Sequence, residues 1–190
     1  MGCSLNMKKA ILLGDSIRLL GYGLAVPQVL EREVEIWQPE ENCRFAQHTL
    51  RGLVDWAEDM KDADVIHWNN GHWDYAEYFG DGEFTPLDVY VETMCRIGRI
   101  LLSRCDKVIF ATNTPVRDGA ACFKNSNVIR YNNAVVPRLR EMGIIINDLH
   151  SVVAADVERY ICEDQVHLSE DGIEVCAKQV ADTIREVIKG

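Results

Sequence analysis

The chain has 190 residues, a formal net charge of -10 at pH 7 and a sequence pI of about 4.9. Hydrophobic residues make up 47% of it and charged residues 26%. That composition is typical of a globular protein with a sizeable core, so we expect one domain over residues 1–190. Nucleic acids and anionic membranes bind basic surfaces, and the acidic balance argues against both as partners. No apolar stretch approaches the roughly 20 residues of a transmembrane helix.

Seven cysteines occur in the sequence, with no CxxC pair and no zinc-finger spacing. Several lie within apolar patterns, where a free cysteine packs as a small hydrophobic residue. We therefore expect a reducing compartment, the cytoplasm. The N-terminal apolar run lacks a small-residue cleavage site, so it predicts a strand and not a signal peptide. The histidines show no metal-ligand spacing, and we predict no metal.

Short apolar runs alternate five times with amphipathic segments of helical period. In chain order, the predicted strands cover residues 8–14, 34–37, 63–68, 107–111 and 144–146, and the predicted helices cover residues 21–33, 49–60, 85–104, 127–142, 151–160 and 169–189. Continuous apolar runs are typical of parallel strands that are buried on both faces. We therefore predict an α/β fold, a three-layer α/β/α sandwich around a five-stranded parallel sheet with right-handed crossovers.

Polar residues follow every predicted strand, and in a parallel sheet these positions gather at the edge where ligands bind. They are Gly14-Asp15-Ser16, Asn42-Cys43-Arg44, Asn69-Asn70-Gly71, Thr112-Asn113-Thr114-Pro115 and Asn147-Asp148. Ser16 is the only serine that directly follows a strand at a helix entry, where backbone N–H groups face a developing anion. Two interpretations stay open: Asp15 and Ser16 cap the first helix, or Ser16 is a nucleophile.

A nucleophilic serine needs a base, and the base needs a group that orients it. Asp164 and His167 lie three residues apart in the predicted loop before the last helix, so they face the same side. The carboxylate can then hold one ring nitrogen while the other points outward. The alternative is a surface pair that caps the helix.

The segment VIHWNNGHWD, residues 65–74, follows the third predicted strand with Asn69 and Asn70. An asparagine amide beside a backbone N–H group can hold a tetrahedral oxyanion, although Asn and Gly are also the residues that turns prefer. The aromatic residues around this loop are Trp68, Trp73, Tyr75, Tyr78 and Phe79. They either pack in the core or, beside Gly80-Asp81-Gly82, form a platform for a sugar. The substrate-binding candidates are Asp15, Asn69, His72 and Trp73.

These motifs together resemble the SGNH or GDSL hydrolase family. The resemblance rests on Gly14-Asp15-Ser16, on Asp164-x-x-His167 followed by a helix, and on ATNTPV at residues 111–116, and it spans about residues 8–188. It implies a flavodoxin-like sandwich and a serine esterase mechanism. In that mechanism Ser16 is the nucleophile, His167 the base and Asp164 its orienting partner. The resemblance further implies an oxyanion hole formed by the backbone N–H groups of Ser16 and Arg44 with the Asn70 amide.

The sequence departs from the family pattern at two places. Arg44 stands where an oxyanion-hole glycine is expected, and a backbone angle that only glycine adopts readily would strain it. Trp73 stands where the family has an asparagine, so Asn70 or Asn69 would supply the amide instead. The Arg44 side chain either faces solvent or holds a substrate carboxylate or sugar hydroxyl, and we favour the second role.

The function that these residues predict is hydrolysis of a small O-acyl ester, an acetyl group on a carbohydrate, without a cofactor. Short acyl groups are expected because no apolar segment is left to form a lid or an acyl tunnel. The alternative is a non-catalytic carbohydrate- or lipid-binding relative with a degraded oxyanion hole. A flavodoxin-like cofactor binder is disfavoured because no glycine-rich phosphate loop is present. The sequence does not determine the oligomeric state.

Overall fold

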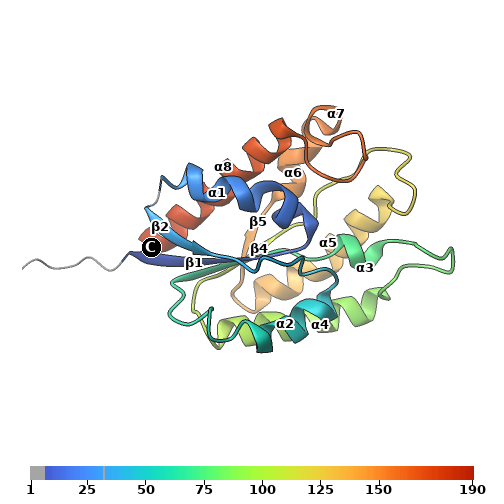
Figure 1. Ribbon diagram of the computed structural model, residues 1–190. Helices are drawn as coiled ribbons and strands as arrows, with labels where there is room; N and C mark the ends of the chain where they lie inside the picture. Colours follow the sequence, from blue (N-terminus) through green and yellow to red (C-terminus); the bar gives the residue numbers. More distant parts are fainter. Residues whose placement is uncertain (1–6, 32) are drawn as a thin grey trace, which may run out of the picture.

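One five-stranded parallel sheet, in the order β2-β1-β3-β4-β5, forms the centre of the molecule (Figure 1). The computed structural model describes residues 7–31 and 33–190. The strands are β1 (Lys8–Leu13), β2 (Val34–Trp37), β3 (Val65–Trp68), β4 (Val108–Ala111) and β5 (Ile145–Asn147). Each lies within one or two residues of its prediction, and the predicted α/β fold class is confirmed.

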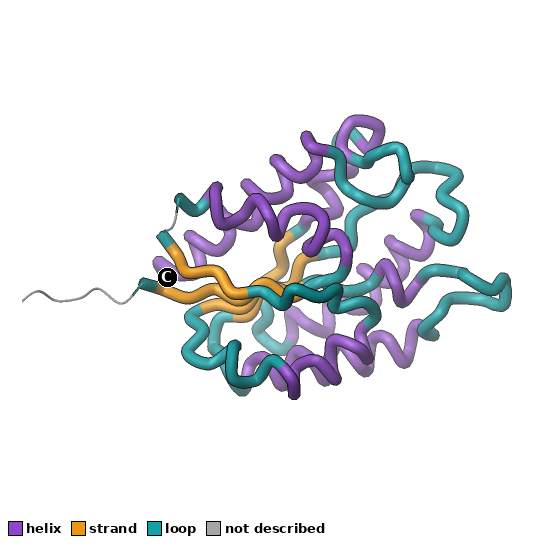
Figure 2. Tube along the Cα trace, viewed as in Figure 1, coloured by secondary structure: helices purple, strands orange, loops and turns teal. Residues whose placement is uncertain are grey.

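Helices cover both faces of the sheet, so that the strands lie between two helical layers (Figures 1 and 2). One layer holds α1 (Gly23–Val29), α6 (Leu149–Ala154), α8 (Glu170–Lys189) and the π-helical turn η1 (Arg18–Tyr22). The other holds α2 (Ala46–Asp55), α4 (Leu87–Leu102) and α5 (Asn125–Glu141). The two short helices are α3 (His72–Tyr75), which contacts α5, and α7 (Val157–Tyr160), which contacts α8.

The pleat of the strands divides the core into two layers. Ile11 and Leu13 of β1 pack with the α2, α4 and α5 side, whereas Ala10 and Leu12 pack with the α1 and α8 side. All residues of β3 and β4 are buried. Continuous burial explains why β4 is an unbroken apolar run and why β3 is apolar except for the buried His67.

Helix boundaries differ from the predictions where distant or capping residues set them. The α2 helix begins at Ala46 because the Asp74 carboxylate, 28 residues away, accepts the Ala46 N–H. The single helix expected over residues 151–160 is two helices, since Asp148 and Asp156 each cap a separate start. The helix expected over residues 21–33 ends at Val29, and residue 32 lies outside the described part.

Within the described residues, none of the helices combines the length and the apolar character that crossing a bilayer requires. The six cysteines of this part of the chain are free thiols, and Cys3 lies outside it.

Candidate active site

Three side chains from the two ends of the chain meet at the carboxyl edge of the sheet. The Oγ atom of Ser16 lies 2.9 Å from Nε2 of His167, and Nδ1 of His167 lies 2.6 Å from Oδ2 of Asp164. The sequence singled out these three residues, and the structure brings them into one chain of hydrogen bonds. Hydroxyl, imidazole and carboxylate in this order form the arrangement in which the ring can take the hydroxyl proton.

The loop that carries Asp164 and His167 is closed on itself. Cys162 donates its backbone N–H to the His167 carbonyl, and Ile161 pairs with Leu168. The Oδ1 atom of Asp164 accepts the N–H groups of Val166 and His167, which leaves Oδ2 for the imidazole. Burial alone would raise the pKa of Asp164, but these N–H donors hold it well below its ordinary value. The carboxylate therefore stays ionised and holds the ring through Nδ1.

Asp15 and Asn69 support the turn that carries Ser16 and are not among the residues that line the pocket. The Oδ1 atom of fully buried Asp15 accepts the N–H of Ile17 and the amide of Asn69, whose own Oδ1 accepts the Tyr22 hydroxyl at 2.6 Å. Gly14 is required here, because a Cβ atom would lie 2.1 Å from Oδ1 of Asn69. These contacts fix the turn that presents Ser16.

Arg18 is a site-supporting residue that the sequence analysis did not identify. It is 1% exposed, and its guanidinium donates to the carbonyls of Gly14, Pro39 and Glu41. These bonds tie the turn after β1 to the loop after β2. The only signal in the sequence is a charged residue inside an apolar segment, which does not distinguish a buried arginine from an exposed one.

The Arg44 N–H and the Asn70 amide, which were expected to form the oxyanion hole with Ser16, donate hydrogen bonds to other groups of the protein. Arg44 has a positive φ of 51°, and its N–H donates to Oδ1 of Asn42 at 2.7 Å. The fully buried amide of Asn70 donates to the Arg44 carbonyl at 2.8 Å and accepts the Trp68 indole N–H. Asn70 thus joins the loops after β2 and β3. The Arg44 side chain is exposed.

A pocket of about 440 Å³ opens in front of the serine. Its lining residues are Ser16, Leu20, Asn42, His72, Trp73, Tyr78, Phe123, Asp164, Val166 and His167. His72 and Trp73 are thus the two substrate-binding candidates that line it. The apolar wall formed by Leu20, Phe123 and Val166 comes from segments far apart in the sequence, and for that reason the sequence did not reveal it.

The aromatic cluster expected around the loop after β3 divides into two sets. Trp68 and Tyr75 are fully buried in the core. Tyr78 and Phe79, by contrast, lie on the loop between α3 and α4 that extends from the body of the molecule, and they are 40% and 80% exposed (Figure 1). Core packing therefore accounts for Trp68 and Tyr75, whereas Trp73 and Tyr78 line the pocket.

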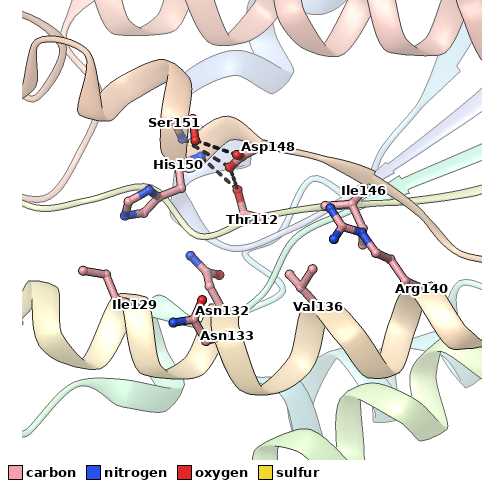
Figure 3. Close-up of a pocket in the computed structure, with 10 residues that line it drawn as sticks. All are labelled: Thr112, Ile129, Asn132, Asn133, Val136, Arg140, Ile146, Asp148, His150 and Ser151. Atoms are coloured by element: carbon pink, nitrogen blue, oxygen red, sulfur yellow. Dashed lines mark hydrogen bonds between the residues drawn. The ribbon is translucent and has the colours of Figure 1, made fainter.

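A second pocket, of about 260 Å³, lies between α5 and the ends of β4 and β5 (Figure 3). The Asp148 carboxylate accepts the hydroxyls of Thr112 and Ser151 and the Ser151 N–H. The His150 ring is turned away from Ser151 and Asp148 (Figure 3). The strand-end residues Thr112 and Asp148 therefore belong to a different pocket from Ser16.

Over residues 7–31 and 33–190, no three His, Cys, Asp or Glu side chains are grouped so that they could hold a metal ion.

No protein-family model matches the sequence, and no curated protein matches it. Among solved structures, a lipase/acylhydrolase from Enterococcus faecalis is 16% identical with a TM-score of 0.80, over 95% of this chain and 96% of that one. The acetyl xylan esterase AlAXEase is 16% identical with a TM-score of 0.78, over 93% and 99%. A carbohydrate esterase family 3 structure from Talaromyces cellulolyticus is 15% identical with a TM-score of 0.75, over 96% and 99%. The chain has the fold of the SGNH/GDSL hydrolases.

Proposed function

We propose that the protein is a serine esterase in which Ser16 is the nucleophile, His167 the general base and Asp164 the residue that orients His167. The observation that carries the proposal is the chain of hydrogen bonds from Asp164 through His167 to Ser16, at 2.6 and 2.9 Å. A serine hydroxyl is a weak nucleophile until a neighbouring base accepts its proton. The neighbours with this fold, which include an acylhydrolase and an acetyl xylan esterase, support the same reaction class.

The reaction follows from the bonds that these groups can make. Ser16 Oγ attacks the ester carbonyl while Nε2 of His167 takes its proton, and the carbonyl oxygen becomes an oxyanion. His167 then returns the proton to the departing alcohol, which leaves an acyl group on Ser16. A water molecule, activated by the same ring, attacks the acyl-enzyme and releases the acid. The backbone N–H of Ser16, at the start of a helical segment, is the first donor to the oxyanion.

We further propose a short O-acyl group, such as acetyl, on a carbohydrate as the substrate class. Two of the structural neighbours are described as an acetyl xylan esterase and a carbohydrate esterase. Three aromatic side chains, Trp73, Tyr78 and Phe123, line the pocket, and aromatic rings suit the apolar face of a sugar. Among the described residues, no lysine or arginine lines the pocket, and this favours an uncharged substrate. The cytoplasmic location stays a prediction.

The rival is a non-catalytic relative that binds a carbohydrate or lipid. It is favoured by one observation, that Arg44 N–H and the Asn70 amide both donate to the protein. Acetylated sugars and p-nitrophenyl esters of increasing chain length separate the two functions. We expect turnover that is fastest on acetyl esters and is lost in Ser16→Ala. Binding of sugars without Ser16-dependent turnover would instead establish the rival.

A further inference from the structure

Asn42, in the loop after β2, is a polar residue at the pocket to which the mechanism above assigns no role. It lines the same pocket as Ser16 and His167 and is half-buried. Its side-chain oxygen accepts the backbone N–H of Arg44 at 2.7 Å. Because that donor must face an oxygen, the orientation of the amide is fixed, and the NH₂ group is its other end. Within the described part of the chain, this NH₂ group donates to no protein acceptor.

The loop that carries Asn42 is bound directly to the nucleophile turn. Cys43 donates its N–H to the Gly14 carbonyl at 3.1 Å, and the Gly14 N–H contacts the Cys43 sulfur at 3.3 Å. Arg18 adds its bonds to the Gly14 and Glu41 carbonyls. Asn42 stands between Glu41 and Cys43, and Ser16 two residues after Gly14. The position of the Asn42 amide relative to Ser16 is therefore held by bonds on both sides.

We propose that the NH₂ group of Asn42 is an oxyanion-hole donor for ester hydrolysis at Ser16. As the Ser16 Oγ–carbon bond forms, the carbonyl π electrons move to the oxygen, and the resulting charge is shared by the Ser16 N–H and the Asn42 amide. When the intermediate collapses, the carbonyl re-forms and the alcohol leaves with the proton from His167. Asn42 thereby supplies the amide that the family pattern places after the third strand, where this chain has Trp73. The inference rests on the esterase function proposed above.

The experiment separates the donor from the turn that Asn42 also supports. Asn42→Asp keeps an oxygen for the Arg44 N–H but has no NH₂ group. Asn42→Ala loses both the oxygen and the NH₂ group. The double variant Asn42→Ala with Arg44→Gly also lacks the NH₂ donor, but its glycine adopts the positive φ at position 44 without strain. We expect all three to lower kcat on p-nitrophenyl acetate by roughly 10²–10³-fold with KM within about threefold, as for other oxyanion donors. The inhibition constant of a boronic acid, which forms a tetrahedral adduct on serine, should rise by a similar factor.

Arg44→Gly alone is the matched control and should keep wild-type kinetics. Recovery of activity in the double variant, or a fully active Asn42→Asp, would show that Asn42 only shapes the loop, and the proposal would be wrong. Both results presuppose Ser16-dependent turnover by the wild type. If the wild type shows none, the esterase function itself fails, and the two failures are thereby distinguished.

Discussion

Two pockets at the carboxyl edge of the sheet each contain a serine, a histidine and an aspartate, yet only one set is connected as a catalytic triad would be. In the first, the His167 ring bridges Asp164 and the Ser16 hydroxyl. In the second, the Ser151 hydroxyl donates straight to Asp148 at 2.6 Å, and the His150 ring is turned away (Figure 3). His150 contributes only its backbone N–H, which donates to the Thr112 hydroxyl.

The comparison shows that residue types alone do not make a catalytic triad. What matters is which hydrogen bonds the two oxygens of the aspartate already accept. Both oxygens of Asp148 accept hydrogen bonds from Ser151, so the carboxylate is used as the N-cap of α6. Asp164 places its backbone bonds on Oδ1 and keeps Oδ2 for the His167 ring. The His167 ring, held by Asp164 through Nδ1, keeps Nε2 for the Ser16 hydroxyl. Asp148 caps α6 and holds no ring in this way, so its serine donates straight to the carboxylate.

The largest contrast is expected between the two serines. Ser16→Ala should lower kcat on p-nitrophenyl acetate by roughly 10⁶-fold, because the nucleophile itself is lost. Ser151→Ala should keep activity within about twofold of the wild type, since no ring faces that hydroxyl. Labelling with a fluorophosphonate, followed by mass spectrometry, checks the assignment. A label on any residue other than Ser16 would contradict it.

The two histidines should differ next most strongly. His167→Ala removes the base and should cost about 10⁴-fold in kcat, the upper range for general base catalysis. His150→Ala changes the second pocket only, where burial lowers the pKa of His150, and it should leave kcat and KM close to those of the wild type. Comparable losses in both variants would mean that the second pocket takes part in the reaction.

Substitutions of Asp164 and Asp148 should differ both in their effect on kcat and in their effect on stability. Asp164→Asn should lower kcat by roughly 10⁴-fold, because an amide stabilises the wrong tautomer of His167. Asp148→Ala should leave the rate unchanged but cost about 1 kcal/mol as a lost helix cap. Steady-state kinetics and thermal melts of both variants separate the two effects.

The stabilising effect of Asp164 should also depend on pH in a definite direction. Folding lowers the pKa of this carboxyl, so its contribution is complete above the unfolded value of about 3.9 and is lost as the pH falls through the folded value. Asp164→Asn should therefore melt below the wild type at pH 7, and the gap should shrink once the pH is lowered below about 4. A constant gap over the whole range would show that the ionised carboxylate is not what stabilises the fold.

The sequence predicted what local patterns determine. Buried strands appear as apolar runs, and Ser16, Asp164 and His167 follow from a strand end and a three-residue spacing. What it did not predict depends on contacts across the chain. Asp74 sets the start of α2, and the Asn70 amide donates a hydrogen bond to the Arg44 carbonyl. A single sequence carries no signal for such pairings between loops, because turn-forming asparagines and ligand-binding asparagines look alike.

The smallest expected effect concerns Arg44, which borders the Ser16 pocket without lining it. The sequence favoured a role as a substrate anchor, but the Arg44 side chain is exposed and is not among the residues that line the pocket. We therefore expect Arg44→Gly to leave KM on acetylated sugars and on p-nitrophenyl acetate within about twofold, as for other surface substitutions. A selective rise of KM on the sugars would restore the anchor hypothesis.

The same variant should be slightly more stable than the wild type. A positive φ costs a non-glycine residue roughly 1–2 kcal/mol, while glycine adds about 0.5–1 kcal/mol of unfolded-state entropy. The net gain should raise Tm by about 1–3 °C in a protein of this size. Glu31→Gly is the matched control, since Glu31 has a φ of 50° and lines neither of the two pockets. Equal gains in the two variants would mean that Arg44 bears only the ordinary cost of its backbone angle, whereas a loss confined to Arg44→Gly would show that the guanidinium stabilises the loop.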